Sequence, residues 1–300
     1  MRRTMSTRCL VAGAVAWALA ASGIAAAAET GDGAVAAEAP RGEGGQAVAA
    51  ETSRDEAGPA RRTPEKPLVS PEADRLLRDM GEYLKDAKQL SFHAEITHDD
   101  LLPTGQKIQL SASYDAAVRR PDRVYVEYWG DGGGRRFWYD GKNVTLYEAD
   151  LNLYGSEPAK PTIDATLDHL IDDLGFTPPL SDLMTSDPGA TLRRNVLFGF
   201  RVGETQVDGV RCQQLAFVEP NIDWQIWIED GTQWVPRKLV ITYKTLPGAP
   251  QFSAVLSDWD LVTRPPDALF TPQLPEGAEK ISFLTTAAKA KGQTTGGEAK

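Results

Sequence analysis

The sequence contains few side chains whose type and spacing suit catalysis or metal binding. It has three histidines. His93 and His98 lie five positions apart on a segment expected to form a strand, so they point to opposite faces and cannot share a metal ion. His169 lies beside Asp168 on an expected acidic helix, where a solvated imidazole is the commoner outcome. We predict no metal site and no cofactor from these residues.

Acidic side chains give the second set of candidates. Asp164, Asp168 and Asp172 recur every four residues and therefore share one helix face. Such a stripe can bind a divalent cation, but on an acidic chain a solvated face is the commoner reading. The Glu229-Asp230 pair falls at a turn, and the chain has no nucleophile elbow, zinc motif, dinucleotide fingerprint or phosphate-binding loop. We predict that the protein is not an enzyme.

The two cysteines cannot form a disulfide in the mature chain. Cys9 lies in an expected leader peptide, which leaves Cys212 alone. No histidine is near Cys212 in the sequence, so a partly buried structural thiol is favoured over a reactive one. The stability of the protein must then come from a hydrophobic core.

Residues 1–28 resemble a cleaved signal peptide. Arg2, Arg3 and Arg8 precede an apolar run, Leu10–Ile24, and three small residues end at Ala28. The run is too short and too rich in Ala and Gly to favour a membrane span, so we expect a soluble periplasmic protein with no transmembrane anchor. Cleavage leaves 29 basic residues (32 less three) against 42 acidic ones, a net charge of −13. That charge argues against nucleic acid as a partner.

Composition divides the remaining chain into three parts. Glu29–Ser70 is rich in Ala, Gly, Glu and Pro and has no aromatic residue, as is typical of a disordered linker. Residues 285–300 have the same character and are expected to form a disordered tail. Residues 71–284 fit a single domain that is large enough for a substantial core.

The domain is expected to begin with a helix and continue as strands. Ser70 can cap a helix whose apolar residues, from Leu76 to Leu84, fall on one stripe. Alternating apolar and polar residues predict strands over 90–97, 107–118, 123–129, 136–139, 144–148, 195–202, 211–218 and 251–261. A helix over 163–174, ended by Gly175, and a short helix from Pro178 to Met184 separate the two groups of strands.

A β-hairpin from Trp224 to Lys244 completes the expected sheet. Asp230-Gly231 supplies a tight turn, and symmetric pairing about it would place Trp227 opposite Trp234 on the outer face. The pattern predicts an α+β fold: one large, curved antiparallel sheet, with the N-terminal helix and the mid-chain helical pair on its concave side.

Several strings support a family resemblance. RRPDRVYVEYWGDGGGRRFWYDGKNVTLYEADLNLY, PTIDATLDHLIDDLG and VDGVRCQQLAF resemble the predicted periplasmic proteins of domain-of-unknown-function family 2092. That family is similar in fold to the lipoprotein carriers LolA and LolB, which implies an open half-barrel whose helices cover a hydrophobic cavity. The acyl-handling residues of those carriers match no motif here, so the resemblance assigns no site residue.

Inward-facing apolar residues are the candidate ligand-binding set. Strand parity and the resemblance together select Val126, Tyr128, Phe137, Tyr139, Phe198, Phe200, Leu215, Phe217, Ile226, Ile228, Leu239, Ile241 and Tyr243. Such residues can equally be ordinary core.

Two hypotheses about function follow. The first is a non-enzymatic periplasmic protein that binds or carries a lipophilic small molecule or acyl chain in the cavity. The alternative is a regulatory module that binds an envelope protein, because the same half-barrel occurs in periplasmic regulators that bind anti-sigma factors. An exposed Trp227/Trp234 pair would favour this alternative.

Overall fold

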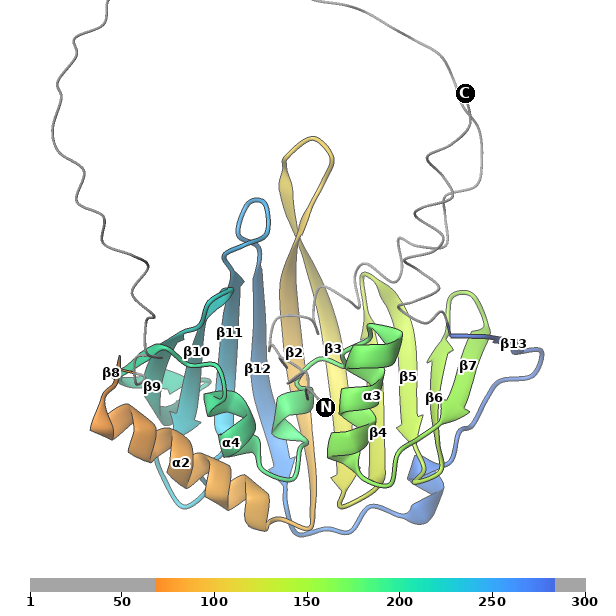
Figure 1. Ribbon diagram of the computed structural model, residues 1–300, viewed down its shortest axis with the longest axis horizontal. Coiled ribbons are helices and arrows are strands. Elements are labelled where there is room, and N and C mark those ends of the chain that lie inside the picture. The colour runs from red at the N-terminus through yellow and green to blue at the C-terminus, as the bar shows by residue number, and fades with distance from the viewer. Residues whose placement is uncertain (1–67, 284–300) are drawn as a thin grey trace, which may run out of the picture.

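The structure, a computed structural model, describes residues 68–283. The predicted signal peptide, most of the predicted linker and the predicted tail lie outside that range. Within it the chain forms one open sheet of 13 strands, and helices pack across one face (Figure 1). The predicted α+β class, a curved sheet with helices on its concave side, is confirmed. We call that side the inner face.

The elements have the following bounds. The strands are β1 (Leu68–Val69), β2 (Gln89–Leu101), β3 (Lys107–Arg119), β4 (Arg123–Gly130), β5 (Gly133–Tyr139), β6 (Asn143–Glu148), β7 (Leu153–Pro158), β8 (Phe198–Val207), β9 (Val210–Val218), β10 (Ile222–Glu229), β11 (Pro236–Tyr243), β12 (Gln251–Asp260) and β13 (Glu279–Ile281). The helices are α2 (Pro71–Asp86), α3 (Ile163–Leu174) and α4 (Pro188–Arg193), with 3₁₀ turns η2 (Ser181–Leu183) and η3 (Asp267–Phe270).

Sheet topology explains why helices cross the inner face. Strands β2 to β7 form one antiparallel meander, β8 to β12 form another, and β12 pairs with β2 to join them. The first meander therefore ends near one edge of the sheet, and the second begins near the opposite edge. The connection from β7 to β8 spans that distance over the inner face, carrying α3, η2 and α4 across it (Figure 1).

The outermost strands correct the prediction of a wholly antiparallel sheet. Strand β1 pairs in parallel with β8, and β13 pairs in parallel with β7. Both are only two or three residues long, too short to show an alternating pattern in the sequence. Leu68–Val69 lies in the stretch expected to be linker, so the described sheet includes the end of that stretch.

Helices α2 and α3 form where their local signals predict. The Ser70 side chain accepts a hydrogen bond from the Ala73 amide at 3.3 Å and caps α2. Thr162 caps α3 in the same way, and Gly175 ends it in the left-handed conformation with φ 61°. Each helix turns its apolar stripe toward the sheet.

The second mid-chain helix differs from its prediction. Residues 178–184 form only the 3₁₀ turn η2, and the α-helix lies further on, at α4. Leu180 adopts the left-handed conformation, with φ 57°, so a right-handed α-helix cannot run through it from Pro178. Asp187 caps α4 and Pro188 occupies its first turn, a start signal that the sequence reading missed.

The hairpin of β10 and β11 has a different register from the symmetric one. Trp227 pairs with Lys238, and the register shifts between Trp227 and Ile228, because the connection is a longer loop than a two-residue turn. Trp227 is half-buried with the Lys238 ammonium 5.1 Å from its ring centre, whereas Trp234 packs against the core. The predicted Trp227/Trp234 pair is therefore wrong, and it supplies no exposed aromatic patch.

Candidate functional site

The inner face of the sheet is almost entirely apolar. Eleven of the thirteen candidate residues are no more than 4% exposed and belong to one hydrophobic cluster. They are Val126, Tyr128, Phe137, Tyr139, Leu215, Phe217, Ile226, Ile228, Leu239, Ile241 and Tyr243. Their contact with a ligand stays a prediction. Their burial makes this face the candidate site.

The inward placement of Phe198 and Phe200 is wrong. Their side chains are 44% and 43% exposed, and the buried residue between them is Gly199. A Cβ at Gly199 would lie 2.3 Å from the Phe217 ring, so that ring occupies the space where a side chain would stand. The Phe-Gly-Phe alternation indicates a strand but does not tell which face is buried.

An irregular segment fills the middle of the inner face. We call residues 176–187, between α3 and α4, the plug. Its side chains Phe176, Leu180, Leu183 and Met184 are buried in the same cluster as the sheet. Leu180 has a φ of 57°, a left-handed conformation that is uncommon for a non-glycine residue. The plug thus reaches the sheet without regular secondary structure apart from η2.

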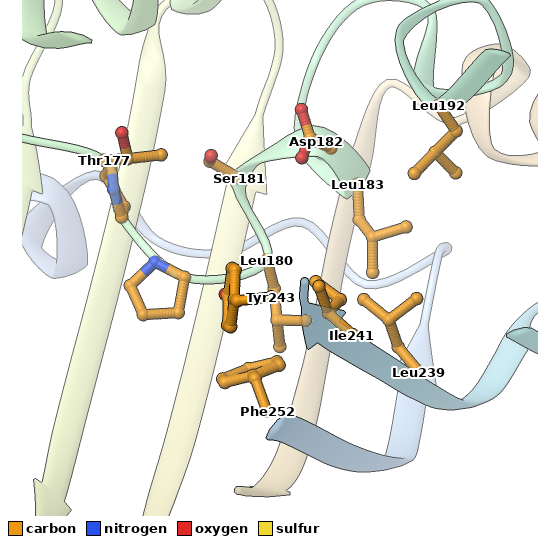
Figure 2. A pocket seen from close by; sticks show the side chains of 12 residues that line it. Thr177, Leu180, Ser181, Asp182, Leu183, Leu192, Leu239, Ile241, Tyr243 and Phe252 are labelled. Atoms are coloured by element: carbon orange, nitrogen blue, oxygen red, sulfur yellow. The ribbon is translucent and has the colours of Figure 1, made fainter. Parts of the chain in front are cut away.

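Two small cavities lie between the inner face and the elements that cover it. A cavity of about 20 Å³ lies where Leu180 and Leu183 meet Ile241, Tyr243 and Phe252 (Figure 2). A second, of about 10 Å³, lies between α3, Met184, Phe137 and Tyr139. Each is close to the volume that one water molecule needs. Neither of these two cavities has room for an acyl chain while the plug side chains stay in place.

Two side chains, Tyr114 of β3 and Arg120 just after β3, bond to the backbone of the plug. The buried Tyr114 hydroxyl donates to the Pro179 carbonyl at 2.7 Å. Burial raises the pKa of Tyr114 well above its usual value, so this group stays a donor. Arg120 donates to the Thr185 carbonyl at 2.8 and 3.2 Å and to the Leu84 carbonyl at 3.0 Å. One guanidinium thereby joins the plug to the end of α2.

The far end of the plug is held by carboxylates. Asp164 of α3 accepts hydrogen bonds from the amide and hydroxyl of Ser186, at 3.1 to 3.3 Å. Asp187 caps α4 through the Ala190 amide at 2.9 Å and pairs with Lys85 of α2 at 2.6 Å. The hydrogen bond from Lys85 lowers the pKa of Asp187. These contacts are polar and partly exposed, so each one alone contributes little to the stability of the closed plug.

A buried glutamate lies beside the plug. Glu219 is 2% exposed and accepts a hydrogen bond from the Trp224 indole at 2.9 Å. Burial, with a smaller contribution from Asp182 of the plug, raises the pKa of Glu219 to about 7 against the opposing effects of Trp224 and Lys244. Sequence reading missed Glu219, because a glutamate before Pro220 at a strand end gives no sign of burial.

Two of the three histidines first considered for chemistry have structural partners. His93 contacts Asp115 at 2.9 Å and Glu95 at 3.1 Å, and His169 contacts Asp173 at 2.6 Å. Within residues 68–283, no group of three or more His, Cys, Asp or Glu side chains is arranged to hold a metal ion.

Cys212 has the setting of a structural thiol. It is fully buried, its Sγ lies 3.4 Å from the Val210 carbonyl, and burial raises its pKa to about 11. A thiol in this setting carries almost no thiolate near neutral pH, so it is a poor nucleophile.

Comparison with solved structures finds similar chains at low identity. The lipoprotein LppX of Mycobacterium tuberculosis is 14% identical, with a TM-score of 0.42 over 65% of this chain and 98% of that one. An uncharacterized conserved protein from Thermus thermophilus is 13% identical, with a TM-score of 0.42 over 70% and 99%. A LolA superfamily protein from Nitrosomonas europaea is 9% identical, with a TM-score of 0.34 over 66% and 97%.

Comparison by sequence gives the family. No curated protein matches the chain. No helix among the described residues is long and apolar enough to cross a membrane. The model of the family described as "Predicted periplasmic protein (DUF2092)" matches residues 73–284, and the chain belongs to that family. The predicted family and the periplasmic location are confirmed.

Proposed function

We propose that this member of the DUF2092 family binds a lipophilic ligand non-enzymatically on the inner face of its sheet, in the space that the plug now fills. The observation that carries the proposal is the way in which the apolar face is covered. Phe176, Leu180, Leu183 and Met184 cover it from an irregular segment whose backbone carbonyls accept hydrogen bonds from Tyr114 and Arg120.

An acyl chain bound on the inner face would make the apolar contacts with the sheet that the plug side chains make in the closed protein. Burial stabilises a bound chain by about 0.8 kcal/mol per CH₂ group. The Leu and Phe side chains that leave the sheet lose a comparable area of contact, so the net affinity depends on how easily the plug is released. Such binding needs apolar lining and no covalent step, which fits the absence of a catalytic motif in the sequence.

Titration of the purified mature chain with a fluorescent long-chain acyl probe tests this function. Wild-type protein is expected to bind, and Ile241→Trp, which fills the cavity beside Leu180, is expected to weaken binding about tenfold (about 1.4 kcal/mol). Val240→Trp is the matched control, since Val240 lies on the opposite face of the same strand.

Native mass spectrometry of protein isolated from its own host complements the titration. Absence of any co-purified lipid, together with no probe uptake, would exclude the carrier function. Equal binding by Ile241→Trp and wild type would instead place the ligand outside the inner face.

A second candidate function is binding of an envelope protein, and one observation favours it. Five apolar side chains around the start of β8 are between 43% and 65% exposed: Leu68, Leu197, Phe198, Phe200 and Val202. We call them the β8 patch. The rings of Phe198 and Phe200 are tilted by 52° to each other, with their centres 5.7 Å apart. Exposed apolar groups gathered in this way commonly mark interaction surfaces.

Capture from envelope extract, compared between variants, tests the second candidate. Phe198→Asp with Phe200→Asp should abolish capture of a partner, and the isolated exposed Val262, changed to Asp, should not. Identical capture by all three proteins would show that the β8 patch has no role.

A further inference from the structure

Glu219 and Asp182 bring carboxyl groups from the sheet and from the plug to one region of the inner face. The Glu219 amide donates to the Ile222 carbonyl, and Ile222 pairs with Tyr243, which lines the same cavity as Asp182. Glu219 follows β9, in the turn to β10, and is almost completely buried. Asp182 belongs to η2 in the middle of the plug and lines the larger cavity (Figure 2). The negative charge of Asp182 opposes ionisation of Glu219. Glu219 belongs to the sheet and Asp182 to the plug, so the two groups lie on surfaces that must separate if the plug leaves the sheet.

The basic group near Glu219 is already engaged. Lys244, just after β11, donates to the backbone carbonyl of Glu219 at 2.9 Å and pairs with Asp223 at 2.8 Å. The Trp224 indole donates to the Glu219 carboxyl group. Both lower the pKa of Glu219, but burial outweighs them. Among the charged groups that act on Glu219, only Asp182 lies on the plug.

We propose that the proton on Glu219 controls the seating of the plug on the sheet. With Glu219 protonated, the carboxyl group is neutral, remains buried beside Trp224 and tolerates Asp182. With Glu219 ionised, burial of its charge is unfavourable, and so is its repulsion from the carboxylate of Asp182. Both free-energy costs fall when the plug moves away and water reaches the site. The consequence for ligand access rests on the proposed function, whereas movement of the plug can be measured without any ligand.

The direction of the pH effect follows from the raised pKa. In the closed protein Glu219 holds its proton up to about pH 7. In an open, hydrated state it would lose its proton near the ordinary glutamate pKa of about 4.3. Between these values the closed state binds more protons, so closure is favoured at low pH and weakened as pH rises toward 7. Above about pH 7 both states are ionised, and the effect levels off.

Hydrogen exchange measured by mass spectrometry on the full mature chain tests the inference. Exchange of peptides covering residues 176–187 is compared at about pH 5 and about pH 7.5, with labelling times scaled for the intrinsic rate. With these two pKa values we expect opening of the plug to increase about sixtyfold over this range in the wild type. Peptides from β3 and β4, far from Glu219 in the sequence, provide the internal reference.

Three variants identify the groups responsible. Glu219→Gln keeps an acceptor for Trp224 but cannot ionise, so its plug should open equally at both pH values. Asp182→Asn should show a smaller pH response than wild type. Glu276→Gln, an exposed glutamate at the other end of the chain, should behave as wild type.

Two outcomes would overturn the inference. One is equal protection of the wild-type plug at both pH values. The other is a pH response that survives in Glu219→Gln or is unchanged in Asp182→Asn. Neither depends on acyl-probe binding. If the plug responds to pH but the protein takes up no acyl probe, the role of Glu219 stands and the lipophilic ligand is rejected. If the protein takes up the probe but the plug does not respond to pH, the proposed function stands and the role of Glu219 is rejected.

Discussion

Helix α2 and the plug cover the same apolar face in different ways. Helix α2 contacts α4, β8 and β10 and lays a regular stripe of six buried residues against them. The plug reaches the sheet with buried apolar side chains from irregular backbone, among them Phe176, Leu180, Leu183 and Met184. Between its ends the helix satisfies its own backbone groups, whereas several backbone groups of the plug bond to side chains outside it, those of Tyr114, Arg120 and Asp164. We therefore call α2 the permanent wall of the inner face, and the plug its removable wall.

Truncation of the α2 stripe should have the largest effect. Leu77 is fully buried in the core cluster. Leu77→Ala should lower the free energy of unfolding by about 2 to 5 kcal/mol, because it removes buried methylene groups and leaves a cavity. Chemical denaturation measures the change. Arg75→Ala, on the exposed face of the same helix, should change it by less than about 0.5 kcal/mol. Equal effects would mean that α2 is not part of the permanent wall.

The helix signals were predictable because they are local. The Ser70 cap, the apolar stripe of α2 and the Gly175 stop lie within a few residues of the structure they specify. The strands of the two meanders were likewise predictable from alternation. The phase of β8 was not, because Gly199 is selected by the Phe217 ring across the sheet. Which residues of β8 face the core is therefore decided by the neighbouring strand β9 and not by the residues next to Gly199 in the sequence.

The contacts of the plug could not be predicted from the sequence. Tyr114 and Pro179 are 65 residues apart, and Arg120 bonds to carbonyls that lie before it and after it in the chain. Neither side chain belongs to a motif. The burial of Glu219 depends on how the crossover from β7 to β8 passes over the sheet, which a single sequence does not reveal. The apolar face was predictable, but the way it is closed was not.

The contact between α2 and α4 should give an intermediate effect. Gly81 and Gly189 meet backbone to backbone, and a Cβ at Gly81 would lie 2.5 Å from the Gly189 Cα. Gly81→Ala gains about 1 kcal/mol in helix propensity but forces α4 away from α2, so we expect a net loss of about 1 kcal/mol in unfolding free energy. Thermal unfolding monitored by circular dichroism checks this.

The control for that variant is Glu82→Ala, which changes an exposed neighbour on the same helix. It should leave the midpoint nearly unchanged or raise it slightly. Stabilisation by Gly81→Ala would contradict the close packing of α2 on α4. It would also weaken the case that the plug is anchored at this end by a rigid helix pair.

Removal of the Tyr114 hydroxyl should have the smallest global effect and the most selective local one. Tyr114→Phe keeps the buried ring but leaves the Pro179 carbonyl without its donor, which costs about 1 kcal/mol. If the plug is a removable wall, this cost falls on plug closure, so exchange in residues 176–187 should rise about fivefold while the unfolding midpoint shifts little. Tyr125→Phe, whose hydroxyl donates to Glu127 on β4, is the matched control and should leave the plug protected. A loss of global stability as large as the local change would mean that the plug and α2 open together, and the distinction between the two walls would fail.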